Sequence, residues 1–185
     1  VREGLVQASH NLPVSTPGED LEAAVHFVIG RLEGALRDMG YAYDVVAAAL
    51  SARGENPTMA RESAEQLTAA VQREDWSLLL DNYARCVRIT RDQSPHKLKG
   101  EALIEPTERG LYDSLLEAEA NIGPKSDVNA FLAAFEPLVP IIQRFFDEVM
   151  VMTEDDDLRH ARLALLQRIA GLATGIADLS QLEGF

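Results

Sequence analysis

The sequence has one cysteine, no long apolar run and no signal segment, and each absence excludes a class of protein. Cys86 is the only cysteine in 185 residues, which excludes an internal disulfide and is typical of a protein in a reducing cytoplasm. No run of eighteen apolar residues is present, so no membrane span is predicted. The chain begins with Val, and no basic-then-apolar signal segment follows, so we expect a fragment or a processed chain.

The residue patterns of common catalytic sites are also missing. There is no Gly-rich phosphate loop, no Cys/His cluster with metal-ligand spacing and no Ser/His/Asp arrangement. Asp156 and His160 share one helical face, but a di-metal bundle needs Glu-x-x-His on two helices, and none is present. The acidic turn at 154–157 is therefore interpreted as solvated helix capping. We predict no catalytic residue, no metal site and no cofactor within this chain.

Charge of one sign dominates the chain. The formal net charge is -13, which disfavours broad, non-specific binding of nucleic acid. Two stretches are basic. Residues 85–99 hold five basic side chains and one acidic one, and the helix that begins near Arg159 is the other. Any contact with phosphates is expected from these two stretches.

Seven stretches show the apolar period of amphipathic helices. Glycine and proline separate them, as at Gly40 and Gly123-Pro124. Residues 1–18 lack this period, so we expect a linker or the tail of an upstream domain there. The fold class expected for residues 19–185 is all-α, a helical bundle of about seven helices. The expected helices cover about residues 19–39, 43–52, 58–73, 76–91, 105–121, 127–152 and 158–179.

The last two helices should supply much of the core. Apolar residues from Phe131 to Met152 recur at steps of three and four, with Pro137 and Pro140 expected to kink the helix near Glu136. After it, Thr153 or Asp155 is placed to cap a final helix, whose apolar face includes Leu165 and Ile169. The one-turn spacing of Gly171 and Gly175 predicts the close approach of a neighbouring helix.

Several segments together resemble one family. They are FFDEVMV before the acidic turn, LRHARLALL after it, ADLSQL near the end, GYAYDVV at 40–46, NYARCVRI at 82–89 and the EPTE step into the fifth helix. This order is similar to the C-terminus of the bacterial glycyl-tRNA synthetase beta subunit. That region is an all-helical anticodon-binding domain, related to the one that ends arginyl-tRNA synthetase.

The resemblance implies recognition of the anticodon stem-loop of glycine tRNA. It also implies partners, namely the rest of the beta subunit and a separate catalytic alpha subunit in a cytoplasmic heterotetramer that uses ATP and magnesium. The implied anticodon has cytosines at its second and third positions, and a carboxylate is the natural acceptor for the cytosine amino group. We therefore expect base reading by Glu154 or Asp155. The expected phosphate contacts are Arg85, Arg88, Arg91, Lys97, Lys99, Arg159 and Arg162.

Other interpretations remain open on the residues alone. Asp81 with Arg85 and Asp92 with Arg88 are spaced for ion pairs within one helix, in which case these arginines are ordinary surface residues. The acidic balance favours a helical protein-interaction module that binds no RNA. An enzyme of the bundle type is disfavoured because the apolar stripes contain no polar constellation.

Overall fold

A computed structural model describes residues 1–13 and 17–185. Within these residues the chain is helical and forms no strand, which confirms the all-α fold class. The α-helices are α1 (Arg2–Ser9), α2 (Gly18–Asp38), α3 (Tyr43–Arg53), α4 (Pro57–Ala70), α5 (Trp76–Thr90), α6 (Pro106–Ala120), α7 (Val128–Phe135), α8 (Val139–Glu148) and α9 (Asp156–Gly171). Short 3-10 helices cover η1 (Gly100–Ala102), η2 (Glu136–Leu138) and η3 (Leu179–Gln181).

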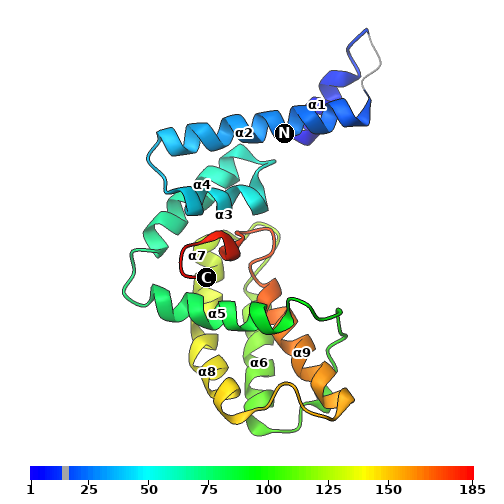
Figure 1. Ribbon diagram of the computed structural model, residues 1–185, viewed down its shortest axis with the longest axis vertical. Coiled ribbons are helices and arrows are strands. Elements are labelled where there is room, and N and C mark those ends of the chain that lie inside the picture. Colours follow the sequence, from blue (N-terminus) through cyan, green and yellow to red (C-terminus); the bar gives the residue numbers. More distant parts are fainter. Residues whose placement is uncertain (14–16) are drawn as a thin grey trace.

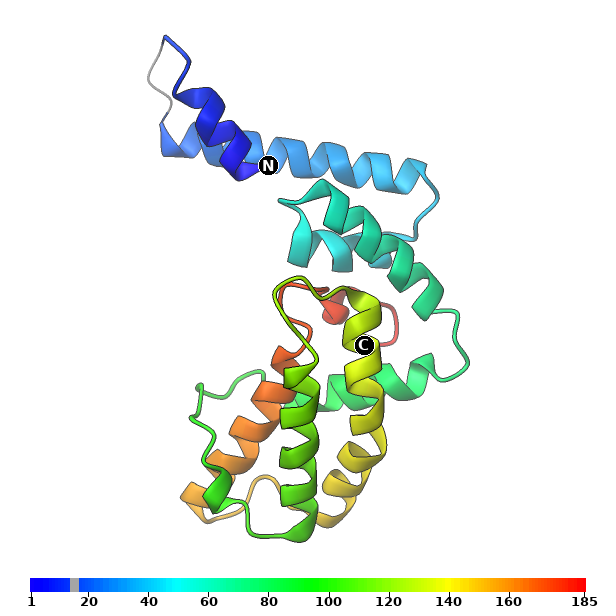
Figure 2. The same cartoon turned by 180° about the vertical axis from the view of Figure 1, so that it is seen from behind.

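The helices form an elongated molecule (Figure 1). In the lower part, α6, α8 and α9 lie lengthwise, and α5 crosses them and packs on both α8 and α9. The rear view shows α6 between α8 and α9 (Figure 2). In the upper part, α3 packs on α4, and α2 lies across their far side with α1 beside it. Residues 1–18 were expected to be a linker or the tail of an upstream domain, which stays a prediction. Among the described residues of this segment, α1 forms, and Arg2 pairs with Glu22 and Glu55.

The phenylalanine stripe lies in the core, as predicted. Phe131, Phe135 and Phe145 are at most 1% exposed. The predicted kink is also confirmed, because η2 interrupts the helix at Glu136–Leu138, where Pro137 lacks an N–H to donate. Buried residues of both α7 and α8 still belong to one core, among them Phe131, Phe135 and Phe145.

The sixth predicted helix ends earlier than expected, at Glu148 instead of Met152. Val149 is already extended, with φ -116° and ψ 122°. Because side chains alternate along extended backbone, Val149 and Val151 are buried, while Met150 and Met152 are 75% and 52% exposed. The predicted stripe was therefore correct up to Val149 and wrong at Met152.

The last helix is also shorter than the pattern predicted. It ends at Gly171, and Gly175 follows with φ +72°, a left-handed conformation that glycine adopts without strain. A Cβ placed on Gly171 or Gly175 would meet nothing within 4 Å. The predicted close approach of a helix at these glycines was wrong. Leu172 and Ile176 are buried nevertheless, because the chain turns back onto the fold after α9.

Residues 172–183 join the two parts of the molecule. Asp178 N–H donates to the Ala48 carbonyl at 2.9 Å, and Arg53 Nε donates to the Gly175 carbonyl at 2.8 Å. The Ser63 hydroxyl donates to the Ile176 carbonyl at 3.2 Å. This returning segment therefore holds α3 and α4 against the bundle that carries the basic stretches.

Candidate nucleic-acid interface

The loop after α5, residues 91–99, folds back along α9. The rings of His96 and His160 are stacked, with their centroids 4.2 Å apart. Gln167 fixes the loop at two points, since its Oε1 accepts from His96 N–H at 3.0 Å and its Nε2 donates to the Ser94 carbonyl at 2.9 Å. The pKa of His96 is lowered, first by desolvation and then by the charges of His160 and Arg159. The two basic stretches are therefore neighbours in space, although they lie far apart in the sequence.

Three of the predicted phosphate contacts, Lys97, Lys99 and Arg159, lie on this loop and at the start of α9. Lys97 and Lys99 are exposed on the loop, and Lys99 Nζ is 4.0 Å from Asp157 Oδ1. Arg159 is 27% exposed; its Nη1 donates to the Thr153 carbonyl at 2.8 Å and its Nη2 pairs with Asp156. The lysines are thus the freer cations, while Arg159 is partly occupied by its own helix N-terminus.

The arginines of α5 make different contacts from those expected. Arg85 lies over the Phe146 ring at 4.2 Å and Arg88 over the Phe185 ring at 5.5 Å, both measured to the ring centroid. In the described part of the chain, neither forms an ion pair with Asp81 or Asp92, so the predicted intrahelical pairs were wrong. Arg85, Arg88 and Arg91 remain exposed, and their contact with RNA stays a prediction.

Arg162 must be removed from the expected phosphate contacts. It is 7% exposed, its Nε lies 2.5 Å from Glu108 Oε1, and its Nη1 donates to the Met150 carbonyl at 2.9 Å. Positions three apart on a helix differ by about 60° around its axis. That rotation leaves Arg159 at the surface and turns Arg162 inward, where it binds the carboxylate at the start of α6.

The two candidate base-reading carboxylates also differ. Asp155 is the N-cap of α9, and its Oδ1 accepts from Leu158 N–H at 3.0 Å. This confirms Asp155, and not Thr153, as the cap. The hydrogen bond occupies one of the two carboxylate oxygens of Asp155. Glu154 is exposed. Base reading by either carboxylate stays a prediction.

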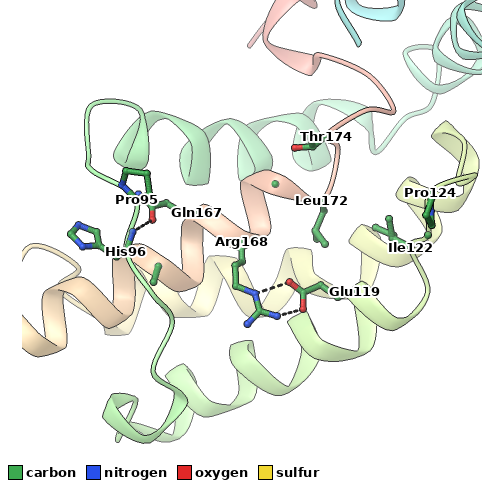
Figure 3. A pocket seen from close by; sticks show the side chains of 12 residues that line it. Pro95, His96, Glu119, Ile122, Pro124, Gln167, Arg168, Leu172 and Thr174 are labelled. Carbon is green, nitrogen blue, oxygen red and sulfur yellow. Dashed lines mark hydrogen bonds and ion pairs between the residues drawn. The ribbon is translucent and has the colours of Figure 1, made fainter. Parts of the chain in front are cut away.

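A groove that the sequence did not reveal lies between the loop, α6 and α9 (Figure 3). Its volume is about 680 Å³. Arg168 Nε donates to Glu119 Oε1 at 2.8 Å, and Arg168 Nη2 pairs with Glu119 Oε2. The pKa of the Arg168 guanidinium is raised, chiefly by this bond. The lining residues are Pro95, His96, Glu119, Ile122, Gly123, Pro124, Ala164, Gln167, Arg168, Gly171, Leu172 and Thr174.

Residues 1–13 and 17–185 contain neither a metal-type cluster nor a membrane-spanning helix. No group of three or more His, Cys, Asp or Glu side chains is arranged to hold a metal ion there. In the same residues, no helix has the length and apolar character needed to cross a membrane. The candidate site is therefore the basic surface of α5, the loop and α9, together with the adjoining groove.

Comparison with known proteins gives a family and several relatives. The family described as "DALR anticodon binding domain" matches residues 79–179, from α5 to η3. A glycine–tRNA ligase beta subunit of Moorella thermoacetica is 35% identical over 165 residues, 87% of this chain and 24% of that protein. One of Acidobacterium capsulatum is 33% identical over 193 residues, 95% and 27%. A chloroplastic/mitochondrial glycine–tRNA ligase of Arabidopsis thaliana is 32% identical over 176 residues, 94% and 16%. The chain thus spans about a quarter or less of these relatives.

Proposed function

Because the chain belongs to the DALR anticodon binding domain family, we propose that it binds the anticodon stem-loop of glycine tRNA. The family membership and the relatives confirm the resemblance drawn from the sequence. They give no support to an acidic protein-interaction module without RNA binding. In the whole protein, this domain would position glycine tRNA for ATP- and magnesium-dependent glycylation on a separate catalytic subunit of a cytoplasmic heterotetramer.

The observation that carries this proposal is the docking of the basic loop along α9. The His96–His160 stack and the two Gln167 hydrogen bonds hold the loop in place. An ordered loop keeps Lys97 and Lys99 at defined positions, so less side-chain and backbone freedom is lost when phosphates bind. An anticodon loop presents unstacked bases on a phosphate backbone, and here a row of cations adjoins a groove.

The net charge of the chain does not contradict this function. Asp156 and Asp157 neighbour the cations, and they make the surface weakly attractive to a generic polyanion. Binding then depends on the correct placement of phosphates and bases, because long-range attraction is small. We therefore expect selective binding with a modest salt slope instead of strong binding to any RNA.

Charge reversal of the loop tests this interface. The double variant Lys97→Glu/Lys99→Glu is expected to weaken binding to glycine tRNA and to lower the salt slope by about one unit for each lost contact. Titrations at two or more salt concentrations measure both quantities. The matched control is Arg31→Glu/Arg61→Glu, which makes the same charge change at exposed positions of α2 and α4. Equal weakening by both variants would show a general charge effect and would contradict this interface.

Catalysis gives a second, independent prediction. The sequence contains no Gly-rich phosphate loop and no other motif for binding ATP, so the purified chain is expected to show no glycine-dependent pyrophosphate exchange. The control is the same assay with the catalytic subunit added, which shows that the assay can detect exchange. Exchange activity that co-purifies with this chain would contradict the proposal that catalysis takes place on a separate subunit.

A further inference from the structure

The groove beside the basic loop has the chemistry of a base-binding site, and we propose that the Glu119–Arg168 pair within it reads one unstacked cytosine of the bound RNA. This inference rests on the proposed function and adds its specificity-determining residues. Both side chains line the groove and are held to each other through two contacts (Figure 3). Their side chains remain 30% and 38% exposed, so solvent reaches the pair within the groove.

The charge of the site favours a neutral ligand. Arg168 is already matched by the Glu119 carboxylate, so the pair has no excess positive charge with which to hold a phosphate or a free carboxylate. A neutral group that carries its own donors and acceptors binds such a pair without leaving either charge unmatched. Nucleobases are neutral, planar and bordered by donors and acceptors.

The walls of the groove fit a flat ring. Ile122 and Leu172 lie near the ion pair, and Pro95 and Pro124 lie on opposite sides of the groove (Figure 3). Apolar walls beside a few convergent polar groups are the usual composition of a small-ligand site. A base that leaves its stack loses apolar contact with its neighbours, and such walls replace it. The volume of about 680 Å³ leaves room for a base and its sugar.

The hydrogen-bonding order of the pair selects among the bases. Glu119 engages Nε and Nη2 of Arg168 and leaves Nη1 free of that contact. Because a guanidinium is planar, Glu119 Oε2, Arg168 Nη2 and Arg168 Nη1 present one acceptor followed by two donors. The pairing edge of cytosine presents one donor, its amino group, followed by two acceptors. Uracil replaces that donor with an acceptor, which would face the carboxylate oxygen unfavourably.

Cations flank the groove where a backbone would enter and leave. Lys97 follows the lining residue His96 on one side, and Lys125 follows Pro124 on the other, and both are exposed. Cations next to the lining residues are where the neighbouring phosphates of a nucleotide in the groove would need them. This arrangement combines positioning by phosphates with reading by the base edge.

An exchange of the two charged residues tests the proposal. The variant Glu119→Arg/Arg168→Glu keeps one acid and one base between α6 and α9 but reverses their order along the groove. Hairpin RNAs that carry the glycine anticodon loop, with each loop cytosine replaced singly by uracil, are the probes. The wild-type chain is expected to prefer cytosine at one position by about tenfold or more. The exchanged variant and Glu119→Gln are expected to lose this preference while still binding the hairpins. Arg144→Gln is the control that should keep it, because Arg144 is an ion-paired arginine of α8 that does not line the groove.

The outcomes separate this inference from the proposed function. If the wild-type chain binds no hairpin at any salt concentration, the proposed function fails. If it binds but the cytosine preference survives in both Glu119 variants, with the helical circular dichroism intact, the groove does not read the base and only this inference is overturned. If a variant loses its helical signal, the preference is measured in Arg168→Lys, which keeps the charge but removes the planar fork; a retained preference there overturns the inference.

Discussion

Replacing Arg162 by methionine is expected to destabilise the fold by about 3–5 kcal/mol, the usual cost of breaking a buried ion pair. Glu108 is fully buried, and Arg162 is the cation that faces its carboxylate. The other oxygen of Glu108 accepts from Ile104 N–H at 2.9 Å and from Glu105 N–H at 3.0 Å. Without Arg162, a charge remains in a place from which water is excluded. Urea or thermal unfolding followed by circular dichroism measures the loss.

An exposed ion pair provides the control for this variant. Arg144 and Glu148 are paired on the surface of α8, with side chains 67% and 46% exposed. Surface pairs contribute up to about 1 kcal/mol, so Arg144→Met should change stability far less than Arg162→Met. A melting curve of Arg162→Met that matches the wild-type curve would show that this pair does not hold the ends of α6 and α9 together. Glutamate at position 162 is expected to be worse than methionine, because it adds a second buried carboxylate.

The second large effect is expected at Leu165. This residue is fully buried in the middle of α9, and its truncation to alanine should cost about 2–5 kcal/mol. The cost has two sources, the lost burial of the removed methyl groups and the cavity that the rigid neighbours cannot fill. The measurement is the same unfolding experiment, with the midpoint and slope fitted separately so that a change in the unfolded state is recognised.

Leu116 provides the matched control, because its replacement by alanine removes the same atoms from a surface position. It lies on α6 and is 41% exposed, so Leu116→Ala should have a small effect. Equal destabilisation by the two leucine variants would contradict the burial pattern described for α6 and α9. Ile169→Ala should behave like Leu165→Ala, since Ile169 is also fully buried one turn further along the helix.

Repeated local signals made much of the fold predictable. The stripe of Phe131, Phe135 and Phe145 specifies a buried helical face at each turn, and several independent residues agree on it. Pro137 locates the break in that stripe because its ring excludes one helical hydrogen bond. Asp155 likewise predicts a helix start through its own short-range bond to Leu158. Each of these signals acts over fewer than five residues.

The features that were predicted wrongly or not predicted depend on contacts between distant segments. Arg159 and Arg162 look alike in the sequence, and only the position of Glu108 on α6 makes one of them internal. The pairing of Glu119 with Arg168 requires α6 and α9 to be adjacent, which no local pattern specifies. The early end of α9 follows from the left-handed turn at Gly175 and from the carbonyls that bind Arg53 and Ser63 after it. These contacts also explain why Leu172 and Ile176 stay buried outside the helix.

The returning segment, residues 172–183, has a consequence for the order of events during protein synthesis. The partners of this segment on α3 and α4 leave the ribosome more than a hundred residues before it does. Until then, Arg53 lacks its Gly175 carbonyl partner, and α3 has an uncovered apolar side. Contacts between residues so far apart in the chain form late, because closing a large loop costs entropy before the contacts can lower the free energy. The first four helices are therefore expected to need chaperone protection until residues 172–183 have been synthesised and can pack on them.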